Sequence, residues 1–483
     1  MTDQPAAVVG IPPAPPARLE PNAIGVAQDT VIGMASSAPA ATVGLSLFLL
    51  ASVTAYGSGP ILILTAIPML IIANAYRRLN LWNANCGASF EWVGRAINPY
   101  LGFITGWLMV AGSLIGTISG VVVLAPSVLA IFGANSSSTW PNILISTAVV
   151  LVMLVIAVLG IRLTARTQVG MGLIEYVILI GFAIAGLVLV LNHHPGTYPF
   201  TRGWVSITGI GGKGSLAAGF LIVVFMYTGW DGSIYVNEEA KHRSTNPGRA
   251  AILAVIFLAI IYTLSEVGLQ GVVSPARLQA NSDSALVYVA QAIGGGGWEK
   301  VMALALALSV VASTGTGIVV ISRMVYRMAS HRVLPEVLSS ISARFSTPAI
   351  ASIVISLIVT AIMWVYLLSS SVANAFTQLI DVTGLLYIAF YILTAVAAMV
   401  YYRSRVFSNA WDALIVGILP ILACVFLGWI LVKSLLAAPA SQLWSIAGII
   451  VIGLVLMFSA RFLMRSPFFQ VQRESATPGP ARS

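Results

Sequence analysis

Long apolar segments recur along the chain, and each is long enough to cross a lipid bilayer as a helix. Crossing about 30 Å of hydrocarbon takes roughly 20 apolar residues in helical form. Only 8% of the 483 residues are charged, whereas soluble domains average about 25%. The sequence therefore predicts an all-α polytopic membrane protein with 12 transmembrane helices. The predicted spans are residues 28–56, 59–79, 98–132, 141–160, 167–192, 215–238, 249–273, 299–328, 348–370, 373–402, 410–434 and 441–464.

Lys and Arg are unequally distributed between the two sides of the predicted bundle. The tails and alternate loops on one side carry 19 of the 24 Lys and Arg residues, and the loops on the other side carry five. Since cytoplasmic loops of membrane proteins are enriched in these residues, both termini are predicted to be cytoplasmic and the protein to lie in the cell (plasma) membrane. The bias also accounts for the net charge of +9. The expected surroundings are therefore a lipid bilayer, and no nucleic-acid partner is predicted.

The sixth apolar segment is interrupted in its middle. An apolar stretch runs to residue 226 and then meets Tyr227-Thr228-Gly229-Trp230-Asp231-Gly232. A membrane helix that loses backbone hydrogen bonds at this depth must face protein or a water-filled cavity. An ionisable residue within the membrane is by default a functional-site hypothesis. We therefore predict that this break forms half of a substrate site.

The first apolar segment contains a second break, at Gly33-Met34-Ala35-Ser36-Ser37-Ala38-Pro39-Ala40. Pro39 has no backbone N–H, and a half-helix that starts here would offer amide groups to an anion. An ordinary kink would explain this segment alone. Two breaks that lie five helices apart are, however, typical of an inverted repeat with the site between the paired breaks.

This spacing predicts the division of the chain. The first five-helix repeat would be 28–192, and the second would be 193–402, including its preceding outer loop. Two further helices would follow in 403–465. Residues 1–27 and 466–483 contain no apolar segment and are predicted to be disordered cytoplasmic tails.

Glu175 is a carboxylate about two turns into the fifth apolar segment. Burial favours the neutral form of a carboxyl group, so Glu175 could carry a proton at neutral pH. The alternative is a fixed hydrogen bond to a neighbouring helix. Glu266 and Asp381 also lie within apolar segments, and for these two the functional and structural interpretations remain open.

Four stretches resemble the amino acid–polyamine–organocation (APC) permease family, which has the leucine-transporter fold. The resemblance covers roughly residues 24–465. The stretches are Gly33 to Pro39; Phe225-x-Tyr227-x-Gly229-Trp230-Asp231 with Asn237 to Lys241 and Asn246 to Arg249; Ser322 to Ala329 with Leu334-Pro335, Arg344 and Ser346 to Pro348; and Ala88 to Trp92 with Pro99 to Trp107.

The resemblance implies which residues contact the substrate. Around the first break, Gly33, Ala35, Ser36, Ser37 and Ala38 would take a carboxylate, mainly through backbone amides. In the sixth helix, Tyr227, Thr228, Gly229, Trp230 and Asp231 would face the amino group, and Phe225 would be the occluding aromatic residue. This chain departs from the family pattern at Asp231, where many relatives have Glu.

The resemblance also identifies candidates for ion coupling. Glu175 occupies the position at which some proton-coupled relatives carry Lys. Ser313 and Thr314 lie where other relatives have a second sodium site, and their hydroxyl groups suit Na⁺ or, equally, the helix backbone. Proton coupling is the favoured expectation, and a sodium-coupled symporter or an exchanger is the alternative.

The expected function is that of a secondary active transporter that moves an amino acid or related organic amine by alternating access. An enzyme is disfavoured because the chain has no H-E-x-x-H motif, no Ser–His pairing signal and no His within a predicted span. A channel is disfavoured because there is no ring-forming repeat and no polar stripe. No metal site and no cofactor is predicted.

Overall fold

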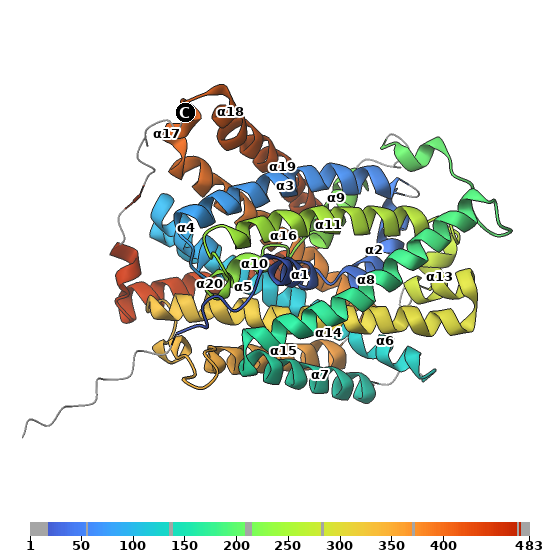
Figure 1. The fold of residues 1–483 in the computed structure, drawn as a ribbon, viewed down its shortest axis with the longest axis horizontal. Coiled ribbons are helices and arrows are strands. Elements are labelled where there is room, and N and C mark those ends of the chain that lie inside the picture. Colours follow the sequence, from blue (N-terminus) through green and yellow to red (C-terminus); the bar gives the residue numbers. More distant parts are fainter. Residues whose placement is uncertain are drawn as a thin grey trace, which may run out of the picture.

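Long helices packed side by side make up the computed structural model (Figure 1). It describes residues 18–54, 57–134, 139–207, 215–281, 285–369, 372–470 and 473–474. Within these ranges the chain consists of helices and loops, together with one isolated β-bridge between Ile24 and Ala240. The prediction of an all-α fold is confirmed.

Eleven helical spans in the described ranges are long and apolar enough to cross a membrane. The predicted sixth span, 215–238, is divided instead among α9 (Ser215–Met226), α10 (Gly232–Tyr235) and η2 (Asn237–Glu239). The spans are formed by α1 (Val26–Ser36) with α2 (Pro39–Thr54), α3 (Ser58–Trp82), α5 (Pro99–Val122) with α6 (Leu124–Ile131), α7 (Thr139–Leu159), α8 (Ile161–Leu191), α11 (Asn246–Leu269), α14 (Gly296–Ser330), α15 (Ala349–Ser369), α16 (Val372–Tyr401), α18 (Ala410–Asp412) with η5 (Ala413–Ile418) and α19 (Leu419–Ala437), and α20 (Ala440–Phe458) with η6 (Ser459–Leu463).

Shorter helices lie at the two ends of the bundle. In Figure 1, α4 and α17 lie at one end of the long helices and α13 lies at the other. The short elements are α4 (Ala88–Ala96), η1 (Arg202–Val205), α12 (Pro275–Ala280), α13 (Ala285–Gly294), η4 (Glu336–Ser339), α17 (Arg403–Val406) and η7 (Pro467–Gln470).

The central helices enclose the two divided ones. The helix pairs α5 and α16, α3 and α11, and α8 and α14 pack against each other, and α2 packs on α9. The peripheral helices leave apolar side chains exposed, among them Leu151, Val177, Val425 and Val455. Hydrocarbon is the medium in which such surfaces are stable, so the division into buried and exposed apolar faces fits a multi-pass membrane protein.

Both described chain ends pack against the bundle. The amide of Ala23 donates to the carbonyl of Glu239 over 2.8 Å, and the amide of Lys241 donates to the carbonyl of Ile24 over 2.8 Å. The Phe468 ring is buried and stacks on Phe90 with 4.2 Å between ring centroids. Residues 18–27 and 466–470 are therefore ordered, not disordered tails as predicted, because backbone pairing and aromatic burial offset the entropy cost of ordering them. Residues 1–17, 471–472 and 475–483 lie outside the described ranges.

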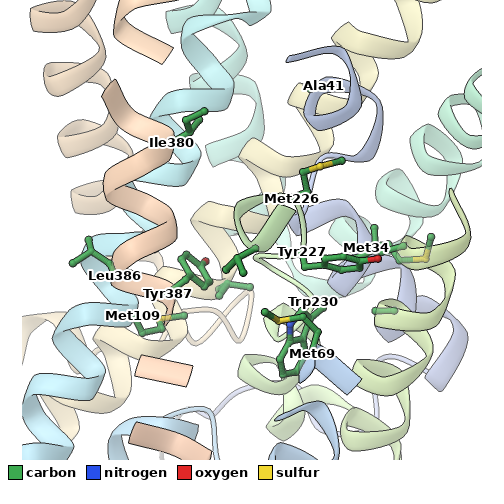
Figure 2. Close-up of a cluster of buried hydrophobic side chains, with 14 of the residues drawn as sticks. Met34, Ala41, Met69, Met109, Met226, Tyr227, Trp230, Ile380, Leu386 and Tyr387 are labelled. Atoms are coloured by element: carbon green, nitrogen blue, oxygen red, sulfur yellow. The ribbon is translucent and has the colours of Figure 1, made fainter. Parts of the chain in front are cut away.

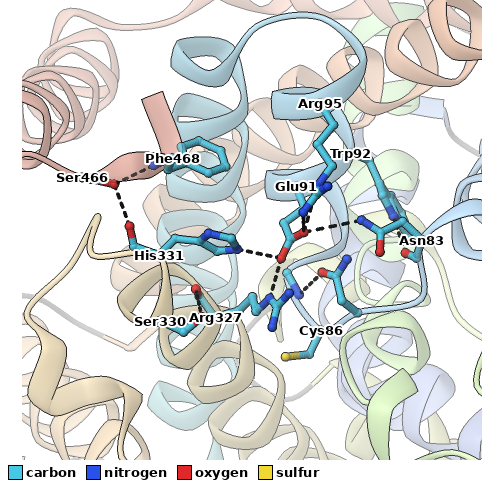
Figure 3. Close-up of polar contacts among 12 residues, drawn as sticks. Asn83, Cys86, Glu91, Trp92, Arg95, Arg327, Ser330, His331, Ser466 and Phe468 are labelled. Atoms are coloured by element: carbon cyan, nitrogen blue, oxygen red, sulfur yellow. Dashed lines mark hydrogen bonds and ion pairs between the residues drawn. The ribbon is translucent and has the colours of Figure 1, made fainter. Parts of the chain in front are cut away.

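An ionic network joins α4 to α14 (Figure 3). The buried Glu91 carboxylate accepts a hydrogen bond from Arg327, hydrogen-bonds with His331 over 3.0 Å and pairs with Arg95 over 3.2 Å. Burial by itself raises the pKa of Glu91, but the hydrogen bond from His331 and the charge of Arg327 outweigh it and lower the pKa to about 2. Glu91 is therefore held as a charged group between two helices.

Candidate functional site

In the structure the first break consists of only two residues, Ser37 and Ala38, between α1 and α2. Ala38 adopts φ +46°, in the left-handed region, where residues other than glycine are uncommon. Pro39, which follows, has no amide hydrogen and suits the start of a helix. The chain therefore ends one helix and begins another without continuing the ladder of hydrogen bonds.

The second break, Tyr227 to Asp231, lies directly against the first. Gly229 has φ +102°, and a Cβ atom there would lie 2.7 Å from the carbonyl carbon of Ser36. A Cβ on Gly33 would likewise lie 2.7 Å from the carbonyl oxygen of Trp230. The two divided helices thus meet backbone to backbone, which is the pairing that the sequence predicted.

A cavity of about 60 Å³ lies between the two breaks. One water molecule needs about 10–15 Å³ on this scale, so the cavity is small. Eight predicted site residues are in its lining: Ser36, Ser37, Ala38, Phe225, Thr228, Gly229, Asp231 and Ser313. The sequence analysis missed the rest of the lining, which comes from α2, α5, α10, α14 and α16. These residues are Ala41, Thr42, Leu45, Met109, Ser113, Gly116, Thr117, Ser119, Gly120, Gly232, Gly317, Val320 and Tyr387.

Other predicted residues lie around the cavity without lining it. Gly33, Ala35 and Thr314 are buried in their helices. Tyr227 donates its hydroxyl hydrogen to the carbonyl of Leu62 over 3.3 Å. Trp230 stacks on Tyr391 with 5.3 Å between ring centroids. Figure 2 shows Tyr227 and Trp230 in the buried cluster beside the break. These residues therefore support the break and do not form the cavity wall.

Asp231 is the carboxylate of the cavity, and it is 2% exposed. The hydroxyl of Tyr391 donates to its Oδ1 over 2.9 Å. One turn earlier on α16, the hydroxyl of Tyr387 hydrogen-bonds with that of Ser113 over 2.9 Å. The spacing of four residues places both tyrosines on one face of α16, and this pair was the signal in the sequence that could have identified α16 as part of the site.

Glu175 lies behind the cavity, at the start of α2. Its Oε1 accepts the amide hydrogen of Ala40 over 2.7 Å, and among the described residues its Oε2 has no hydrogen-bond partner. The next amide, that of Ala41, donates to the hydroxyl oxygen of Ser309 over 3.2 Å. Glu175 is fully buried, so α8 places a carboxylate at the N-terminus of the second half of the divided helix.

The amide groups at the first break are engaged, which corrects the expectation that they are free. The amide of Ser37 donates to the carbonyl of Met34 over 3.0 Å, and that of Ala38 donates to the carbonyl of Ala35 over 3.1 Å. These bonds form because α1 closes its last turn before the chain changes direction.

The hydroxyl hydrogens of Ser313 and Thr314 are also used. Both donate to the carbonyl of Val310, over 3.0 and 2.7 Å. Their oxygen lone pairs remain as acceptors, and Ser313 presents its oxygen near the cavity. Among the residues that the structure describes, no group of three His, Cys, Asp or Glu side chains could hold a metal ion.

Known transporters are similar to this chain in sequence. The γ-aminobutyric acid permease of Bacillus subtilis is 23% identical over 62% of this chain and 64% of its own length, so the match spans less than two thirds of that relative. A D-serine/D-alanine/glycine transporter of Escherichia coli is 22% identical over 75% of this chain and 78% of its own. An arginine/ornithine antiporter of Lactococcus lactis is 20% identical over 65% of this chain and 66% of its own.

The fold is similar to that of a solved transporter. The manganese transporter of Eremococcus coleocola superposes with a TM-score of 0.59 at 13% sequence identity, over 91% of this chain and 95% of that one. This likeness shows that the fold is shared. The model of the amino acid permease family matches residues 28–462, and the chain therefore belongs to the amino acid permease family, whose members are transporters.

Proposed function

We propose that this protein is a secondary active transporter that moves an amino acid or a related organic amine across the cell membrane by alternating access, coupled to protons. The observation that carries this proposal is the meeting of two divided helices around a cavity that contains a buried carboxylate. Broken helices at the level of the membrane are tolerated where they line a cavity, and in transporters they form the substrate site.

Asp231 is the proposed acceptor for the substrate's ammonium group. Its carboxylate lines the cavity and is oriented by Tyr391. The carbonyl oxygens and hydroxyl lone pairs of the two breaks add further acceptors. Phe225, also in the lining, is the proposed occluding residue.

Glu175 is the proposed proton carrier. It is buried and has one oxygen without a partner among the described residues, so a proton could be held there without breaking the bond from Ala40. A sodium ion at Ser313 and Thr314 is the second candidate for coupling, supported by the oxygen that Ser313 presents at the cavity.

The proposed arrangement in the membrane follows the Lys and Arg bias, with both termini in the cytoplasm. The proposed rocking units derive from the repeats 28–192 and 193–402. The divided helices belong one to each repeat, so relative movement of the repeats would open the cavity to alternate sides.

Uptake into proteoliposomes tests the proposal. Amino acids and amines are supplied with imposed pH or Na⁺ gradients, and saturable uptake driven by an inward proton gradient is expected. Asp231→Ala should lower uptake by roughly 100-fold, because the bound ammonium loses its buried partner, while the protein stays folded. Glu266→Gln is the matched control, since Glu266 lies outside the cavity and bonds Ser46 over 2.7 Å. Unchanged uptake by Asp231→Ala would refute its place in the site.

Glu175→Gln tests the coupling. The amide oxygen of Gln still accepts a hydrogen bond from Ala40, but the side chain no longer exchanges a proton. Counterflow of substrate without a gradient should persist, and stimulation by the pH gradient should fall. An unaltered response to the gradient removes Glu175 from coupling, and a requirement for Na⁺ favours the sodium site.

A further inference from the structure

We propose that the transported substrate is a compact primary amine without a carboxylate group. The inference rests on the proposed transport function and narrows its substrate class. It follows from the hydrogen bonds at the first break, where a carboxylate, two carbonyls and a hydroxyl of this chain already accept the amide hydrogens that would bind a substrate carboxylate.

The first break offers no free amide in this conformation. Ser37 and Ala38 donate to carbonyls of α1, Pro39 has no N–H, Ala40 donates to Glu175, and Ala41 donates to the Ser309 hydroxyl. The N-terminus of a helix attracts an anion, and here the anionic side chain is supplied by α8. Whether or not Glu175 carries a proton, its oxygen accepts the amide hydrogen of Ala40.

Most hydroxyl groups of the cavity use their hydrogen within the protein, so they face the cavity as hydrogen-bond acceptors. Six of them donate to backbone carbonyl oxygens and so present lone pairs to the cavity: those of Ser36, Thr42, Thr117, Ser119, Thr228 and Ser313. The hydroxyls of Ser113 and Tyr387 bond each other. Among the hydroxyl groups of the described lining, that of Ser37 has no hydrogen-bond partner.

The charge of the cavity also favours an ammonium group over a carboxylate. Asp231 is the one ionisable carboxylate of the described lining, and no Lys, Arg or His accompanies it there. A carboxylate buried beside Asp231 would find few donors and a like charge, which costs free energy. An ammonium group would find a carboxylate and several acceptor oxygens. The cavity volume of about 60 Å³ restricts the amine to a compact one.

The test compares each amino acid with the amine that its decarboxylation yields. Wild-type protein in liposomes is given the pairs alanine and ethylamine, serine and ethanolamine, and ornithine and putrescine. Each amine differs from its parent only by the carboxylate, so the pair isolates that group. We expect kcat/KM for uptake to be on the order of 100-fold higher for the amine than for its parent.

The outcomes separate this inference from the function on which it rests. Uptake of the amino acids equal to or above that of their amines overturns the inference and leaves the proposed transport function intact. Absence of both uptake and binding for every amine and amino acid overturns the two together.

A pair of variants at one residue tests the role of Glu175 in selectivity. Glu175→Ala frees the amide of Ala40, and Glu175→Gln keeps an acceptor on it. Binding is measured by calorimetry on detergent-solubilised protein, so that ion coupling does not enter. Glu175→Ala should raise the affinity for an amino acid relative to its amine by roughly tenfold, and Glu175→Gln should keep the wild-type preference. If Glu175→Ala folds and its affinity ratio between amino acid and amine is unchanged, Glu175 does not set this selectivity. If the variant does not fold, the uptake comparison with wild-type protein still tests the inference.

Discussion

Gly229 lies where the backbones of the two divided helices approach each other closely. Its φ of +102° is one that side-chain-bearing residues rarely adopt, and Ser36 leaves no space for a Cβ atom. The residue therefore determines how near Asp231, two positions later, can lie to the first break. A single hydrogen atom in place of a side chain is what allows the cavity to form.

Gly229→Ala should destabilise the protein. The left-handed backbone alone costs about 1–3 kcal/mol for a residue with a side chain, and the contact with Ser36 adds to it. Thermal unfolding in detergent and substrate binding measure the effect, and both should fall. Gly170→Ala is the matched control, because a Cβ at Gly170 on α8 meets nothing within 4 Å; its unfolding midpoint should stay the same or rise. Equal unfolding midpoints and equal substrate binding in the two variants would contradict the close approach of the breaks.

At the scale of elements, α14 is attached to the segment that follows the second break. The fully buried Arg323 on α14 donates two hydrogen bonds of 2.9 Å to the two carboxylate oxygens of Glu239 in η2. The carbonyl of Glu239 also accepts the amide of Ala23. This bidentate pair therefore joins α14, η2 and the segment before α1.

Arg323→Met should lower the free energy of unfolding by about 3–5 kcal/mol, because it leaves the Glu239 carboxylate buried without its partner. The double variant Arg323→Met with Glu239→Leu should recover most of this loss, since apolar groups of similar size replace both charges. Denaturant unfolding of the single and double variants measures the coupling. Additive losses would show that the pair does not act as a unit.

At the scale of the whole molecule, the Glu91 network connects parts that are far apart in sequence. Glu91 on α4 binds Arg327 and His331 at the end of α14, and Arg95 of α4 pairs with Glu474 near the C-terminus over 2.9 Å. Phe468 stacks on Phe90, the neighbour of Glu91. One buried carboxylate thus stabilises the contact between the two proposed repeats, beside the docked C-terminal segment.

The pH dependence of stability should report this network. The pKa of Glu91 is about 2 in the folded protein, below its ordinary value of 4.5. A depressed pKa contributes stability that is fully present above the unfolded-state value and is lost as the pH falls toward the folded-state value. The stability difference between wild type and Glu91→Gln should therefore be largest above pH 4.5 and shrink towards pH 2. A difference that is independent of pH across this window would show that ionisation of Glu91 is not the source.

The sequence by itself determined that the chain is a bundle of membrane-spanning helices, the places at which two of them are divided, and the family. These properties are local: a run of apolar residues is long enough to cross a membrane or is not, and a proline or a glycine with a carboxylate interrupts it wherever it occurs. The residues at the breaks, such as Ser36 and Asp231, could be identified for the same reason.

Only the tertiary structure decided which groups the breaks meet. Glu175 lies 135 residues from Ala40, and Tyr391 lies 160 residues from Asp231, so no local pattern relates them. The order of the C-terminal segment likewise depends on Phe90, which lies far away in the sequence. Hydropathy and backbone propensity act over a few residues, whereas hydrogen bonds between helices depend on how the helices pack. For that reason the amides at the first break were expected to be free, and the fold engages them.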